Sequence, residues 1–167
     1  MVTRQAPAPA AAQTLVRTFR GAAAQAAVAR RWARAAAGEM AGPDVADLAE
    51  MAVAELLANA VQHSRSGRPG GTVTVIVVGG ADGVTVHVHD LGAVRGTVPR
   101  PRHPAGQADG LAESGRGLLI VAALSQASGS GPARACHQAG ASGPAAAAGG
   151  TCAWFRLAGT AHGQAAR

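Results

Sequence analysis

The chain has 167 residues, enough for one compact domain and too few for two comfortable ones. All 15 of its basic residues are arginines, and the absence of lysine excludes ATP sites built around a phosphate-binding lysine, such as those of P-loop proteins and protein kinases. The net charge of +6 raises the question of nucleic acid, but the arginines are scattered and only 2% of the residues are aromatic, which argues against a stacking surface for single strands.

Both ends of the chain lack the patterning of folded elements. Residues 1–13 are rich in Ala and Pro and are expected to form a flexible tail, with a second tail at residues 159–167. A single domain is therefore predicted over residues 14–158. No uncharged apolar run approaches the ~20 residues needed to span a bilayer, and no signal peptide is evident. We expect a cytoplasmic protein without a membrane partner.

The first half of the domain is predicted to hold one strand and two helices. A short strand is expected at residues 14–19, and strong helix formers follow over residues 22–40. Gly42 ends this helix, and Pro43 suits the first turn of a second helix at residues 44–64. An apolar stripe at helical spacing marks the core face of the second helix: Val45, Leu48, Met51, Ala52, Leu56 and Ala60.

A β-hairpin is predicted next. After a turn-rich break at residues 66–71, two β-branched runs occupy residues 72–78 and 84–90. The glycine-rich segment between them, residues 79–83, is typical of a hairpin turn.

The second half of the domain is less regular. Residues 91–114 are rich in Gly, Pro and Arg without periodicity, which predicts a long mobile loop. An apolar helix is expected over residues 115–127 and a closing strand over residues 151–158. The low-complexity stretch at residues 129–150 is expected to contain one strand near residues 133–138.

The predicted order is strand, helix, helix, hairpin, long loop, helix and strand pair. Strands cluster beside helices without the regular alternation of a Rossmann fold. We therefore predict an α+β fold, a two-layer sandwich in which a mostly antiparallel sheet packs on helices.

Two cysteines and two strand histidines raise the question of a metal or redox site. Cys136 and Cys152 are too few and too far apart in the sequence for a zinc site or a redox pair, and we interpret them as ordinary reduced cysteines on late strands. His87 and His89 share one face of a strand, but no third ligand is evident beside them. No zinc site is predicted.

One candidate segment of a nucleotide site lies in the second predicted helix. Glu55 and Asn59 are one turn apart, so their side chains share a face. A carboxylate and a carboxamide placed in this way can offer oxygens to a hard cation and polarise a nucleophile. Such a pair is also common on solvated helices, but the surrounding apolar residues predict that part of this turn is buried. His63, one turn further on, is interpreted as a capping or solvated histidine.

Two further segments follow along the chain. Asp90 ends the second hairpin strand, where it can accept a hydrogen bond from an exocyclic amine such as that of adenine, and Gly92 lets the backbone approach a flat base. Gly115, Arg116 and Gly117 open the next predicted helix, whose free N–H groups and dipole suit a phosphate. Each segment alone is typical of an ordinary loop or helix start. The three occur in the order that an ATP pocket needs.

These segments resemble the sequence boxes of the GHKL superfamily, whose ATPase domain has the Bergerat fold. "ELLANAVQH" resembles the N box, "VHVHDLG" the adenine-binding G1 box, and "ESGRGLLIVAALS" the G2 box with its glycine-rich lid hinge. "GTCAWFRL" is similar to the closing strand of the family. Within the superfamily, the chain resembles the anti-sigma-factor serine kinases related to SpoIIAB and RsbW, over roughly residues 14–158.

The resemblance implies a role for each matching residue. Asn59 is expected to ligate Mg²⁺, and Glu55 to act as the general base or to orient the attacking hydroxyl. Asp90 is expected to bind the adenine amine, with Gly92 under the base. The start of the lid helix is expected to hold the phosphates of ATP: Gly115, Arg116, Gly117 and Leu118.

The resemblance favours one function and leaves others open. It implies an Mg-ATP-dependent protein serine/threonine kinase whose partners are a sigma factor, a STAS-type anti-anti-sigma antagonist, or both. The alternative is an ATP-binding module that acts through protein contacts without kinase activity. A detached histidine-kinase domain is disfavoured because no phosphoacceptor histidine precedes residue 40. Nucleic-acid binding is suggested by charge alone, and homodimerisation stays open.

Overall fold

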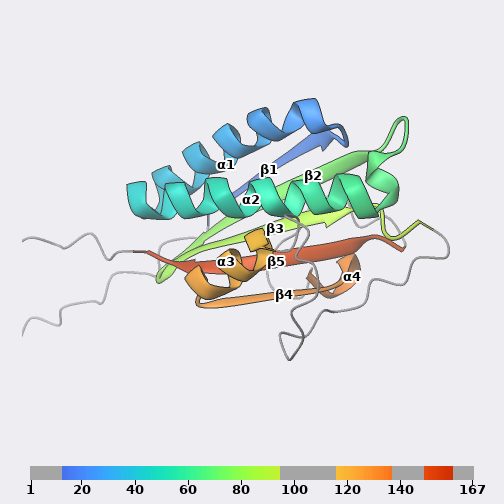
Figure 1. Ribbon diagram of the computed structural model, residues 1–167. Coiled ribbons are helices and arrows are strands. Elements are labelled where there is room, and N and C mark those ends of the chain that lie inside the picture. The colour runs from blue at the N-terminus through green and yellow to red at the C-terminus, as the bar shows by residue number, and fades with distance from the viewer. Residues whose placement is uncertain (1–12, 95–115, 137–148, 160–167) are drawn as a thin grey trace, which may run out of the picture.

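Figure 1 shows the protein as a computed structural model, which describes residues 13–94, 116–136 and 149–159. The long elements are β1 (Thr14–Arg20), α1 (Ala26–Ala41), α2 (Pro43–His63), β2 (Thr72–Gly80), β3 (Gly83–Asp90), α3 (Arg116–Leu124), β4 (Ala127–Pro132) and β5 (Thr151–Ala158). The described residues also form three short helices: 3-10 turns at Ala23–Gln25 and Arg65–Gly67, and α4 (Ala133–Cys136). The predicted order of strands and helices is confirmed.

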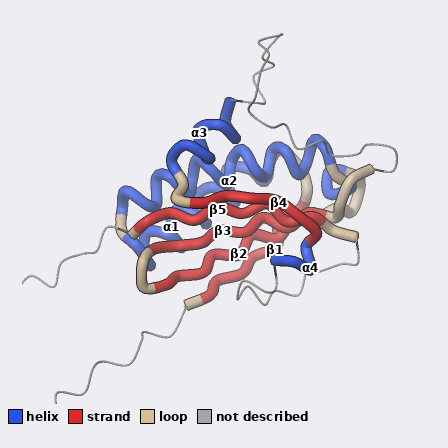
Figure 2. The backbone as a smooth tube through the Cα atoms, turned by 90° about the horizontal axis from the view of Figure 1, so that it is seen from below, coloured by secondary structure: helices blue, strands red, loops and turns tan. Residues whose placement is uncertain are grey.

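The five strands form one sheet in the order β1-β2-β3-β5-β4, and all neighbouring pairs are antiparallel. Helices α1 and α2 lie along one face of this sheet (Figure 2). Helix α3 packs against α2 and against the β4–β5 edge, whereas α4 contacts β3, β4 and β5. The predicted two-layer α+β sandwich is confirmed.

The core lies between the helices and the sheet, because alternate side chains along each strand point toward the helices. Val73, Val75 and Val77 of β2 are fully buried in it. Small alanines on α1 let the two long helices approach closely. Other buried members include Val84, Val86, Val88, Phe155 and Leu157 from the sheet, and Ala29, Ala33 and Ala37 from α1.

The buried face of α2 is wider than the predicted stripe. Val45, Ala52, Leu56 and Ala60 are buried as predicted, but Leu48 and Met51 are only half-buried. The prediction omitted four buried residues: Ala46, Ala49, Val53 and Leu57. The reason is that α2 packs against both α1 and the sheet, so its core face spans two neighbours instead of one.

The hairpin is confirmed and its turn is tighter than predicted. Gly80 pairs with Gly83, so the strands extend to a two-residue connection at Ala81–Asp82. Gly83 has a φ of +140°, which favours glycine.

The strand predicted near residues 133–138 is wrong. The strand is β4, six residues earlier, and Ala133–Cys136 form one helical turn. β4 has the sequence ASGSGP, which lacks β-branched residues, so only its pairing with β5 defines it. The rest of that low-complexity stretch up to residue 148, the predicted loop beyond residue 94 and both predicted tails, apart from Gln13 and Gly159, lie outside the described residues. In the ranges described, no helix is long and apolar enough to cross a membrane.

Candidate nucleotide site

Asn59 lies on α2 at the edge of the face that packs against the core. Leu56 and Leu57, just before it, are buried against the core, and Asn59 itself is half-buried. The side-chain Nδ2 of Asn59 is buried and has no hydrogen-bond partner in the described part of the chain. A buried amide without a partner costs about 1–3 kcal/mol, so the position suits a group that a ligand completes. A flip of the amide places its oxygen there, and an amide oxygen fits Mg²⁺.

Glu55 lies one turn before Asn59 and is also half-buried. It lines the edge of an open groove between α1 and α2, together with Met51 and Ala54. The same groove contains Arg30 and Arg34, and Arg34 forms ion pairs with both Asp47 and Glu50. Asn59 is not part of this groove. Glu55 therefore lies between the open groove and the part of α2 that carries Asn59.

Asp90 is fixed by two short hydrogen bonds at the end of β3. Its Oδ1 accepts from the Gly92 N–H at 2.6 Å and from the Thr151 hydroxyl at 2.6 Å. Thr151 is the register partner of Asp90 across β3 and β5. Both of these bonds go to Oδ1. Among the contacts of the described residues, Oδ2 is therefore left to accept a hydrogen bond from an exocyclic amine.

Gly92 occupies a position that only glycine fits. Its φ is +82°, and a Cβ there would lie 2.0 Å from the carbonyl oxygen of Gly149. The Gly92 carbonyl accepts from the Arg65 N–H at 2.9 Å. The segment after β3 is therefore packed tightly between the end of α2 and the start of β5.

The C-terminal end of α2 is tied to the same segment. The hydroxyl of Ser66 accepts from the Leu91 N–H at 3.0 Å and donates to the Thr72 carbonyl at 2.6 Å. The Arg65 guanidinium donates to the Leu91 carbonyl, with Nε at 2.8 Å, and Ser64 forms a β-bridge to Ala93. These contacts hold the helix of Asn59 and the strand end of Asp90 in one frame.

The third predicted segment is only partly described. Residues 116–124 form α3 as predicted, but the helix ends before residue 127. Gly115 lies outside the described residues, and the side chains of Arg116 and Leu118 are not described. Because α3 packs against α2, this helix lies on the same side of the sheet as Asn59. Phosphate binding by this turn stays a prediction.

Sequence reasoning missed Thr151, Arg65 and Ser66. Thr151 opens the closing strand directly after a glycine pair, but only the strand register reveals that it faces Asp90. His63 is exposed in the last turn of α2, in keeping with a solvated histidine.

The interpretation of the cysteines as reduced is wrong, and only Cys152 lies on a late strand, β5. Cys136 lies in α4, and it forms a disulfide with Cys152. This disulfide lies beside His87 and His89. The sequence showed no third metal-ligand type of residue near the two histidines, and the structure brings two cysteines to them from distant segments. Burial, and then the neighbouring His89, lower the pKa of His87 to about 4.

A comparison with known families finds a match over most of the domain. A family model described as the histidine kinase-like ATPase domain matches residues 19–136, more than half of the chain. The matched range begins at the end of β1 and includes Glu55, Asn59, Asp90 and Gly92. No curated protein matches the chain.

Proposed function

The chain belongs to the histidine kinase-like ATPase domain family, and from this premise we propose that it is an Mg-ATP-dependent protein serine/threonine kinase that acts as an anti-sigma factor. ATP binding follows from the family itself. The observation that best supports the site assignment is the hydrogen-bonded frame around Asp90, which presents one carboxylate oxygen beside a tightly packed glycine.

Asp90 supports a preference for adenine. A carboxylate accepts hydrogen bonds and cannot donate them, so it pairs with the exocyclic amine of adenine and repels the carbonyl oxygen of guanine. Thr151 and the Gly92 N–H hold Oδ1, which orients Oδ2 toward the base before the nucleotide arrives. The close backbone packing at Gly92 leaves a surface without side-chain bulk next to that carboxylate.

Asn59 and Glu55 supply the polar groups for phosphoryl transfer. Asn59 would hold Mg²⁺ through its amide oxygen, and the ion would neutralise charge on the ATP phosphates when bound. Glu55 would accept the proton of the attacking serine hydroxyl or orient that hydroxyl. The backbone N–H groups at the start of α3 would hold phosphate oxygens.

The partners belong to the same proposal: a sigma factor, a STAS-type anti-anti-sigma antagonist, or both. Exposed apolar side chains on α3 support a role in protein contact. Leu119, Ile120 and Leu124 are 54%, 44% and 48% exposed. A second candidate, an ATP-binding module without kinase activity, is favoured by the place of Glu55 at the edge of an open, solvated groove.

A phosphotransfer assay separates the two candidates. The full chain is mixed with γ-labelled ATP, Mg²⁺ and STAS-type proteins encoded beside its gene. We expect label on a serine or threonine of one such protein, and no label with Glu55→Gln, which should still bind ATP. Glu39→Gln removes an exposed carboxylate at the end of α1 and is the matched control. ATP binding without transfer or hydrolysis would favour the non-catalytic module.

A further inference from the structure

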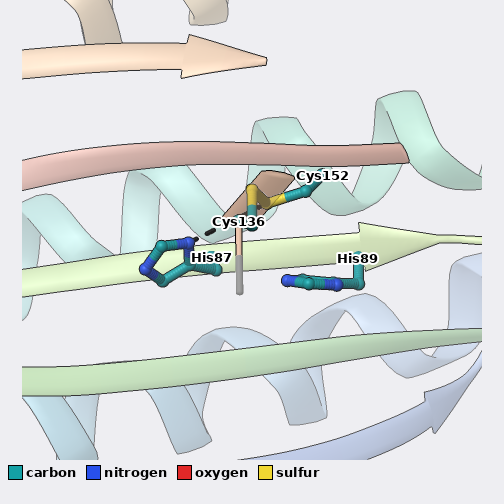
Figure 3. Close-up of side chains that lie close together, drawn as sticks. All are labelled: His87, His89, Cys136 and Cys152. Atoms are coloured by element: carbon teal, nitrogen blue, oxygen red, sulfur yellow. Dashed lines mark hydrogen bonds between the residues drawn. A yellow bond between two sulfur atoms is a disulfide. The ribbon is translucent and has the colours of Figure 1, made fainter. Parts of the chain in front are cut away.

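Four side chains of metal-ligand type meet on the face of the sheet opposite to α1 and α2 (Figure 3). His87 and His89 belong to β3, Cys152 to β5 and Cys136 to α4. Their exposed fractions are 1%, 2%, 0% and 6%, so the cluster is buried. One ligand atom from each of the four lies within 4.8 Å of the others.

The fold builds this cluster from three elements. His87 and His89 are two residues apart on a strand, so they point to the same face. Cys152 is the register partner of His89 on the neighbouring strand. Cys136 arrives from α4, whose residue Ala133 bonds to the Gly150 carbonyl at 2.9 Å. Ligands from separate segments thus converge without any short sequence motif.

The disulfide does not account for the burial of both nitrogens of His87. Nδ1 of His87 lies 3.8 Å from the Cys152 sulfur, and Nε2 of His87 is buried with no hydrogen-bond partner among the described residues. A buried imidazole nitrogen without a partner is costly and calls for an explanation. The set of two cysteines and two histidines is one that structural zinc sites use.

We propose that His87, His89, Cys136 and Cys152 form a redox-switched zinc site, which holds a disulfide when oxidised and one Zn²⁺ when reduced. Tetrahedral zinc with these ligands requires donor atoms about 3.3–3.8 Å apart, given Zn–S and Zn–N bonds of about 2.3 and 2.0 Å. With donor atoms already within 4.8 Å, rotation of side chains suffices to reach that geometry once the S–S bond is open.

The switch balances in atoms and electrons. A dithiol reductant gives two electrons and two protons to the S–S bond, which becomes two thiols, and the dithiol becomes a disulfide. Zn²⁺ then displaces two protons from the thiols and binds two thiolates and two neutral imidazoles. Two thiolates cancel the charge of the ion, so the filled site is neutral and compatible with burial. Hydrogen peroxide reverses the switch: it takes two electrons from the thiolates and two protons, forms two water molecules, and releases Zn²⁺.

Cobalt substitution tests the site without relying on a variant. The full chain is reduced under nitrogen with a phosphine, freed of metal, and titrated with Co²⁺ and then Zn²⁺. We expect the visible bands of tetrahedral thiolate-bound cobalt at one ion per chain, their loss on adding Zn²⁺, and no bands from the disulfide form. A reduced chain that stays folded by circular dichroism and shows no such bands would overturn the proposal. If the reduced chain unfolds, metal-dependent refolding supports the site and its absence overturns it.

Variants then identify the ligands. His87→Ala and Cys152→Ser should each weaken Zn²⁺ binding by more than the ~10–100-fold that loss of an outer-shell partner costs. His63→Ala removes an exposed histidine from the end of α2 and should leave Zn²⁺ binding unchanged. If His87→Ala and His89→Ala bind Zn²⁺ as tightly as the unaltered chain, then the histidines are not ligands and the proposal fails.

Discussion

The Thr151 hydroxyl donates a 2.6 Å hydrogen bond to Oδ1 of Asp90 across the pairing of β3 with β5. The same oxygen accepts from the Gly92 N–H. The carboxylate that is assigned to adenine is therefore oriented by the closing strand of the sheet as well as by its own loop. The residues that orient Asp90 therefore come from two segments that are far apart in the sequence, the loop after β3 and the start of β5.

Asp90→Asn is expected to weaken ATP binding by about 10-fold or more, because a hydrogen bond to a charged group contributes about 1.5–3 kcal/mol. Thr151→Val should act in the same direction with a smaller effect, since it frees the carboxylate and leaves the charge. Calorimetric titration with ATP and GTP measures both variants. Asp82→Asn, in the exposed hairpin turn, is the control. Unchanged ATP affinity in Asp90→Asn would remove Asp90 from the site.

The strands and helices were predictable where local pattern is strong. The valine-rich hairpin and the two long helices have clear periodicity, and Pro43 marks the start of α2. The candidate site residues Asn59, Asp90 and Gly92 were chosen from short motifs, and their roles stay predictions.

Relations between distant segments were not predictable. The Asp90–Thr151 bond joins residues 61 positions apart, and only strand register creates it. β4 consists of small residues whose intrinsic preference is not for strands, so its position depends on pairing with β5. The disulfide depends in turn on β4, because α4 follows that strand directly and brings Cys136 to Cys152.

Asn59→Ala is expected to separate stability from function. The variant removes a half-buried amide whose Nδ2 has no hydrogen-bond partner among the described residues, so the free energy of unfolding should stay equal or rise by about 1 kcal/mol. Mg-dependent ATP affinity should be lost, because the expected metal ligand is gone. Urea unfolding and calorimetry with and without Mg²⁺ measure the two effects. Gln62→Ala, at an exposed position on the same helix, controls for helix propensity. Mg-dependent affinity that survives in Asn59→Ala would contradict the assignment.

Gly92→Ala is expected to destabilise the fold more than Gly70→Ala. Both glycines have positive φ, at +82° and +79°, so both variants incur a similar backbone cost of about 1–2 kcal/mol. At Gly92 the new Cβ would also lie 2.0 Å from the Gly149 carbonyl oxygen, whereas no atom of the described residues lies within 4 Å of the new Cβ at Gly70. Urea unfolding compares the pair, and ATP titration should show loss of affinity for Gly92→Ala alone. Equal destabilisation would show that the contact with Gly149 is not tight.

Opening the disulfide is expected to lower the stability of the metal-free chain by about 3 kcal/mol, the chain-entropy value for a loop of about 15 residues. The two cysteines are 16 positions apart. Unfolding of the chain with and without a phosphine reductant, in the presence of a chelator, measures the loss. The double variant Cys136→Ser with Cys152→Ser should not respond to the reductant. A reduced chain as stable as the oxidised one would show that the cross-link constrains nothing.

ATP affinity is expected to depend on the state of the Cys/His cluster. His89 precedes Asp90, and Cys152 follows Thr151, so the cluster lies on the opposite face of the sheet directly behind the adenine frame. The disulfide joins β5 to α4, which also contacts β3, and a metal would join all three elements. Either cross-link therefore restrains the end of the β3–β5 pairing. The reduced, metal-free chain should therefore bind ATP about 5-fold or more weakly than either cross-linked form, at the lower end of common coupling energies.

Thermodynamic linkage allows this expectation to be tested through ATP binding and through Zn²⁺ binding. If Zn²⁺ strengthens ATP binding by some factor, then ATP must strengthen Zn²⁺ binding by the same factor. Titrations of ATP into the disulfide, reduced and zinc-loaded chains, and of Zn²⁺ with and without ATP, measure both. Asp90→Asn should bind Zn²⁺ normally but lose its response to ATP. Equal ATP affinity in all three states would mean that the cluster stabilises the sheet without reaching the nucleotide, because Asp90 and Thr151 then keep their geometry whatever lies behind them.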